Sequence, residues 1–137
     1  MKRIRLIFFF ALPLISVKAQ PKDSAQQRAI RDYTLLNQSL NEPGIKNKNV
    51  KMMIVDFPPL TVASPHRHPC PTFGYVLEGS IESVFEGRNY IYKKGDSFYE
   101  FTNGLHAKTR NPDPVIPAKL LVFFIIDPNQ ETSIREH

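Results

Sequence analysis

The sequence predicts an all-β domain, an antiparallel sandwich or small barrel, from three observations. Short runs rich in Val, Ile, Phe and Tyr recur about every eight to twelve residues, a spacing typical of strands. Turn-forming residues separate these runs, and the intervening loops are too short to hold crossover helices. Cys70 is the only cysteine, so no intramolecular disulfide can form and stability must come from a compact apolar core.

The N-terminal stretch has the design of a secretory signal peptide. A basic start precedes the apolar run Leu6–Val17, and Val17-Lys18-Ala19 provides a small-residue cleavage pattern. An uncleaved membrane anchor is the alternative, but the run falls short of the roughly 20 residues that span a bilayer. The sequence therefore predicts a signal peptide over residues 1–19, and an exported protein, periplasmic or secreted, with no membrane span after cleavage.

The remaining chain has almost no net charge. The signal segment carries four of the 18 basic residues and none of the 13 acidic ones, so its removal lowers the formal net charge from +5 to +1. No block of basic residues with interleaved aromatics is left, which argues against a nucleic-acid partner. The 118 residues that follow residue 19 (137 minus 19) suit one domain.

The strands can be placed in order along this domain, which we predict to cover residues 20–127. Residues 24–40 have apolar residues at helical spacing but would also make an edge strand, and a strand beginning near Ile30 is favoured. Residues 128–137 have little to bury, which predicts a flexible C-terminal tail. Further strands are expected at Lys51–Phe57, Phe73–Leu77, Ile81–Phe85, Asn89–Tyr92, Ser97–Phe101 and Lys119–Ile126.

Three histidines form the candidate site. His66 and His68 are one residue apart, and in an extended segment side chains at i and i+2 point to the same face. A pair of this kind alone is more often two surface histidines near a turn. His106 changes that interpretation, because it follows two predicted hairpins, and an antiparallel barrel can return it to the side of the first pair.

These residues resemble the two sequence motifs of the cupins, G(X)5HXH(X)3-4E(X)6G and G(X)5PXG(X)2H(X)3N. His66 and His68 fill the HXH of the first motif, and Gly79 falls on its closing glycine. Gly95 opens the second motif, and His106 falls on its histidine. The resemblance implies a cupin-type antiparallel β-barrel, or jelly roll, with one divalent metal ion bound by the three histidines.

The motifs also depart from the family pattern. The position of the family's glutamate ligand is occupied by Thr72, and no acidic residue occurs between His68 and Glu78. In the second motif, the proline, glycine and asparagine are replaced by Phe101, Asn103 and Arg110. The sequence therefore most resembles the three-histidine subgroup of cupins, which includes dioxygenases that cleave dicarbonyl compounds and relatives that act on small thiols.

Three neutral imidazoles leave the charge of a divalent ion uncompensated and leave coordination positions open, so such a site invites an anionic or bidentate ligand. The resemblance favours Fe(II), while Zn, Cu, Ni and Mn remain alternatives. The leading hypothesis is a dioxygenase-like enzyme that cleaves a small metal-chelating compound. The alternatives are a non-catalytic barrel that binds a small molecule or a metal, and a metal-dependent isomerase or lyase.

Two further residues could reach the metal. Glu100 lies near the end of a predicted strand and is a candidate catalytic residue, either orienting a histidine or acting as a base. A solvent-exposed carboxylate is the ordinary interpretation, and replacement of the missing ligand is a less favoured one. Cys70 is expected to be a small buried thiol rather than a ligand. Leu120–Ile126 is apolar on both strand faces, which favours a homodimer.

Overall fold

A computed structural model describes residues 29–136, so the predicted signal peptide lies outside the described residues. Within this range the chain forms strands, and no helix there is long and apolar enough to cross a membrane. The strands are β1 (Arg31–Glu42), β2 (Ile45–Phe57), β3 (Val62–Ala63), β4 (His66–Arg67), β5 (Thr72–Glu78), β6 (Ser80–Phe85), β7 (Arg88–Lys93), β8 (Ser97–Glu100), β9 (Leu105–Arg110), β10 (Ala118–Ile126) and β11 (Ile134–Arg135).

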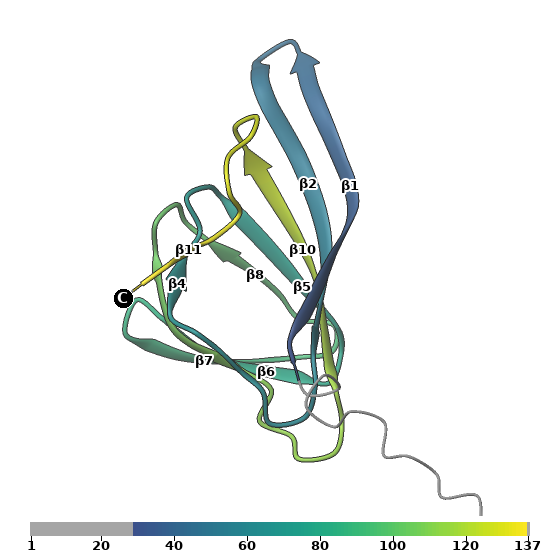
Figure 1. Ribbon diagram of the computed structural model, residues 1–137, viewed down its shortest axis with the longest axis vertical. Helices are drawn as coiled ribbons and strands as arrows, with labels where there is room; N and C mark the ends of the chain where they lie inside the picture. The colour runs from purple at the N-terminus through teal and green to yellow at the C-terminus, as the bar shows by residue number, and fades with distance from the viewer. Residues whose placement is uncertain (1–28, 137) are drawn as a thin grey trace, which may run out of the picture.

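The strands form two sheets, which face each other in Figure 1. The first sheet has the order β1-β2-β10-β5-β8, and the second has the order β11-β4-β9-β6-β7 with β3 paired to β9. Neighbouring strands are antiparallel. The all-β antiparallel prediction is therefore confirmed, and the strand favoured near Ile30 is β1, which pairs along its length with β2 and projects with it as a long hairpin.

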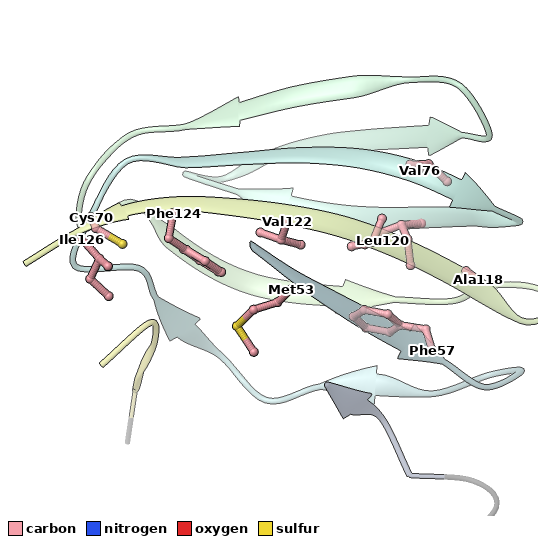
Figure 2. Packing of buried hydrophobic residues seen from close by; sticks show 10 residues of the cluster. Met53, Phe57, Cys70, Val76, Ala118, Leu120, Val122, Phe124 and Ile126 are labelled. Atoms are coloured by element: carbon pink, nitrogen blue, oxygen red, sulfur yellow. The ribbon is translucent and has the colours of Figure 1, made fainter. Parts of the chain in front are cut away.

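The core lies between the sheets. Alternate residues of β10 point inward, and they pack against residues of β2, β5 and β6 (Figure 2). The outward-facing residues of β10 are less buried, although three of the four, Leu121, Phe123 and Ile125, are also apolar. The buried cluster consists of Met53, Phe57, Cys70, Val76, Ile81, Ala118, Leu120, Val122, Phe124 and Ile126.

The C-terminal segment differs from the flexible tail that the sequence predicts. Ile134 and Arg135 form β11, which pairs with β4, and the backbone N–H of Glu136 donates to the carbonyl of Pro65 over 3.0 Å. Composition is a poor guide here, because a sheet edge holds a partner strand by backbone hydrogen bonds and needs few apolar side chains to do so. The segment after β10 therefore crosses back to the histidine-bearing strand.

Candidate metal centre

Strand pairing brings His66 and His106 together. His66 in β4 lies directly opposite His106 in β9, and residues that face each other across an antiparallel pair project from the same side of the sheet. Their imidazole rings stack with centroids 4.8 Å apart and an interplanar angle of 5°. The distant histidine predicted to complete the pair is thus placed by the β4–β9 register.

His68 completes the cluster. Its ring meets those of His66 and His106 edge-on, with centroids 5.0 Å and 5.2 Å away. One ligand nitrogen from each of the three side chains lies within 4.8 Å of the others. The three histidines are therefore positioned to bind a metal ion.

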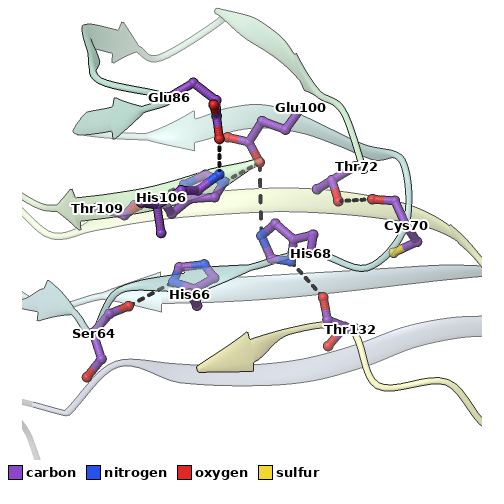
Figure 3. Close-up of polar contacts among 11 residues, drawn as sticks. Ser64, His66, His68, Cys70, Thr72, Glu86, Glu100, His106, Thr109 and Thr132 are labelled. Carbon is purple, nitrogen blue, oxygen red and sulfur yellow. Dashed lines mark hydrogen bonds and ion pairs between the residues drawn. The ribbon is translucent and has the colours of Figure 1, made fainter. Parts of the chain in front are cut away.

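Backbone carbonyls orient two of the rings (Figure 3). His66 Nδ1 is 2.8 Å from the carbonyl oxygen of Ser64, and His68 Nδ1 is 2.6 Å from that of Thr132. Because a carbonyl only accepts, each Nδ1 carries the proton and donates it, which leaves the Nε2 lone pair available to a metal. Burial lowers the pKa of His66, and it lowers the pKa of His68 to about 4, so both rings are neutral at pH 7.

The third ring carries an unsatisfied atom that fits a metal. His106 is 4% exposed, and its Nδ1 lies 3.2 Å from the hydroxyl of Thr109, whereas its Nε2 is buried without a hydrogen-bond partner. A buried polar atom without a partner is costly, and a coordinated cation removes that cost. Imidazole nitrogens suit zinc, iron, copper and nickel, so the residues present fit a divalent transition metal and leave its identity open.

Glu100 lies beside these nitrogens and not in solvent. It is the last residue of β8, is 4% exposed, and faces the histidine cluster (Figure 3). Its Oε2 atom is 2.9 Å from His106 Nε2 and 4.0 Å from His68 Nε2. The structure thus overturns the ordinary interpretation of a solvent-exposed strand-end carboxylate.

Cys70 is a core residue, as the sequence suggests. It is 3% exposed and belongs to the buried apolar cluster, and burial raises the pKa of its thiol. Thr72, which occupies the position of the missing motif glutamate, is 1% exposed and donates from its hydroxyl to the Cys70 carbonyl over 3.2 Å. Neither side chain belongs to the three-histidine group.

The histidines line one side of a largely apolar cavity of about 210 Å³. Most of its wall comes from β2, β10 and the inner face of the second sheet, with residues such as Met53, Leu120, Val122 and Phe124. Thr132 and Ser133, from the segment predicted to be a loose tail, also line it. Nothing in that polar segment signals this role, because its position depends on the β11–β4 pairing.

The lowered pKa of His68 predicts acid sensitivity of the metal-free protein. Between pH 6.5 and about 4 the unfolded chain binds a proton at His68 that the folded chain does not bind. Stability must therefore fall as the pH falls through this window, by at most about 3 kcal/mol. Urea unfolding at a series of pH values measures the slope, and a His68→Asn variant should show a shallower one. Equal slopes for the two proteins would contradict the prediction.

A family model described as Cupin domain matches residues 53–124, which include the three histidines and Glu100. The chain belongs to the cupin family. A putative germin-like protein 8-1 of Oryza sativa subsp. japonica is 33% identical to this cupin over 107 residues, a match that covers 72% of the chain and 48% of the relative. The chain thus spans about half the length of the curated relative it matches.

Solved structures share the fold of this cupin at low sequence identity. A cupin 2 domain-containing protein from Halorhodospira halophila matches with a TM-score of 0.63 and 16% identity, covering 85% of this chain and 76% of its own. The DMSP lyase DddQ from Ruegeria pomeroyi also has a TM-score of 0.63, at 20% identity over 84% of this chain and 55% of its own. An oxalate oxidase in complex with glycolate matches with a TM-score of 0.55 at 22% identity, over 63% and 45% of the two chains. The predicted jelly-roll fold is thereby confirmed.

Proposed function

We propose that this cupin is a mononuclear metal enzyme that uses oxygen to cleave a small organic compound that chelates the metal. The observation that carries the proposal is the convergence of three ring nitrogens on the wall of a small apolar cavity. A redox-active divalent ion bound there would polarise a chelating substrate and supply one-electron chemistry. An oxalate oxidase is among the structures that share this fold, at 22% identity, which supports an oxidative reaction as the proposal to test first.

The cavity limits what such a substrate can be. Its volume of about 210 Å³ corresponds to roughly seven water molecules, taking about 30 Å³ for each. Apolar side chains from β2 and β10 would contact the carbon skeleton and exclude water, while the histidine side of the cavity would face a polar chelating group. Small dicarbonyl compounds and small thiols meet these requirements, and flavonols serve as larger comparison compounds.

Oxygen uptake tests this proposal. We expect the protein, purified without an affinity tag or chelator and reconstituted with Fe(II), to consume oxygen with at least one small dicarbonyl or thiol. The zinc-loaded protein is the control and should consume none, because zinc has no redox chemistry. An iron-loaded protein that binds these compounds but leaves oxygen untouched would contradict the proposal and indicate a binding barrel.

A metal-dependent lyase or isomerase is a second candidate, and the position of Glu100 favours it. Its buried carboxylate, 2.9 Å from His106 Nε2, could act as a base that removes an acidic carbon-bound proton from a substrate bound at the histidines. This candidate predicts turnover without oxygen, whereas the oxidative proposal predicts none under those conditions. It also predicts that Glu100→Gln abolishes turnover when the variant is assayed at a metal concentration that saturates its site, so full anaerobic activity of that variant would exclude it.

A further inference from the structure

We propose that Glu100 is itself a metal ligand, so that the carboxylate absent from the first cupin motif is supplied by the neighbouring strand β8. This inference rests on the metal centre of the proposed function, but it concerns the ligand set and not the reaction. Two things are required. The side chain of Glu100 must extend into the part of the interior that a glutamate at position 72 would occupy, and its carboxylate must point toward the same ion as the histidines.

The register of β5 and β8 meets the first requirement. Thr72 lies directly opposite Glu100 in the antiparallel pair, so both side chains project from the same face of the sheet, with Cβ atoms about 5 Å apart. Both residues are buried, at 1% and 4% exposure, and the Thr72 hydroxyl donates to the carbonyl of Cys70. A longer side chain at position 100 therefore reaches the interior region beside position 72.

The distances to two of the three histidines support the second requirement. Glu100 Oε2 lies 2.9 Å from His106 Nε2 and 4.0 Å from His68 Nε2. Ligand atoms bound at about 2.1 Å to one octahedral ion are separated by about 3.0 Å when adjacent and about 4.2 Å when opposite. These two distances are those of a ligand adjacent to His106 and opposite His68, whereas Glu100 has no contact within 4.0 Å of His66, so coordination requires the carboxylate and the His66 ring to move closer together.

The short contact with His106 does not have hydrogen-bond geometry. His106 Nε2 has no hydrogen-bond partner, although the Glu100 oxygen is only 2.9 Å away. A proton shared by the two atoms would lie along the line between them, whereas two ligands of one ion both point toward a third position. The lack of a hydrogen bond at this short distance fits two ligands of one ion.

The buried carboxylate of Glu100 also lacks a lysine or arginine partner within residues 29–136. Its ion pairs in this range are with His68 and His106. A buried carboxylate is stable only when it is paired or coordinates a metal.

The added ligand narrows the substrate class. Three neutral imidazoles and one carboxylate reduce the net charge of a divalent centre to +1 and, in an octahedral shell, leave two positions open. A bidentate compound with one negative charge, such as the enolate of a small dicarbonyl, balances this centre. A dianion such as oxalate would leave it with a net negative charge.

Affinity for Mn(II), a metal that accepts carboxylate ligands, tests the assignment. We expect Glu100→Gln to weaken Mn(II) binding at least about 100-fold, measured from the electron paramagnetic resonance signal of free Mn(II), because a direct ligand is lost. Glu78→Gln is the matched control, since Glu78 is an exposed acid at the far end of β5 and should leave the affinity unchanged. Circular dichroism and thermal unfolding of the metal-free variants verify that each has folded.

A double variant that swaps the two opposite residues makes the test sharper. In Thr72→Glu/Glu100→Thr the carboxylate moves from position 100 to position 72, and we expect this double variant to recover most of the Mn(II) affinity that Glu100→Gln loses. A crystal structure of the Mn(II)-loaded wild-type protein needs no variant, and should place a Glu100 oxygen within about 2.2 Å of the ion.

The outcomes separate this inference from the proposed function. Unchanged Mn(II) affinity in Glu100→Gln, or a Glu100 oxygen outside the coordination shell of the bound ion, would overturn the inference and leave the three-histidine enzyme standing. A loss of Mn(II) affinity greater than about 100-fold, beyond the roughly 10–100-fold expected for a residue that only orients a ligand, supports the inference whether or not oxygen uptake is found. A wild-type protein that binds no metal after reconstitution would overturn both.

Discussion

Replacement of His106 with alanine is expected to reduce the metal content from about one ion per chain to almost none, with affinity falling at least about 100-fold. His106 has the buried nitrogen without a hydrogen-bond partner, and it lies against the other two rings, so its loss removes one ligand and opens a gap beside them. Elemental analysis of protein purified without an affinity tag or chelator measures the content, and titration calorimetry with Zn(II) measures the affinity.

The control for this experiment is His137→Ala, which removes the remaining histidine of the chain and should keep its metal. His66→Ala should behave like His106→Ala, because His66 lies directly opposite it across the β4–β9 pair. Retention of one tightly bound ion by His106→Ala in a correctly folded protein would mean that the metal centre lies elsewhere, and would remove the basis of the proposed function.

A second large effect is expected at Gly79, where we predict that alanine lowers the free energy of unfolding by roughly 2–5 kcal/mol. This glycine has a φ of +68°, and a Cβ added to it would lie 2.5 Å from the carbonyl oxygen of Pro117 and 2.9 Å from Cα of Ala118. The contacts are with backbone atoms at the start of β10, which cannot move aside without disturbing the central strand of the first sheet.

Gly87 provides the matched control for this substitution. Its φ of +73° is almost the same, but a Cβ there would meet no atom within 4 Å. Gly87→Ala should therefore lower the free energy of unfolding only by the cost of placing an alanine at positive φ, about 1–2 kcal/mol. Urea unfolding of the two variants gives the comparison, and equal losses would show that the contact with β10 does not constrain Gly79.

The strands and part of the site could be predicted because they depend on local pattern. Runs of β-branched and aromatic residues between turn residues identify strands such as β5, β6 and β10, and their alternation gives the buried face. The joint placement of His66 and His68 follows from the two-residue period of an extended segment. Cys70 between two prolines was likewise correctly predicted to be a core thiol.

The role of the C-terminal segment could not be predicted, because it depends on an edge that other parts of the chain create. Ile134 and Arg135 hydrogen-bond to β4 through their backbones, and this pairing brings the carbonyl of Thr132 to His68. Backbone groups are the same in every residue, so a polar segment carries no side-chain signal for such a contact. The prediction of a flexible tail failed for that reason.

The amino-acid pattern was enough to predict an antiparallel β fold with a histidine pair in one extended segment, because strand propensity and side-chain alternation act between near neighbours. The pairing of His106 with His66 and of Glu100 with Thr72 became known from the folded structure. Register between distant strands is set by the packing of the whole core, and a shift of one residue would turn each side chain to the other face. The metal centre therefore rests on strand register as much as on its histidines.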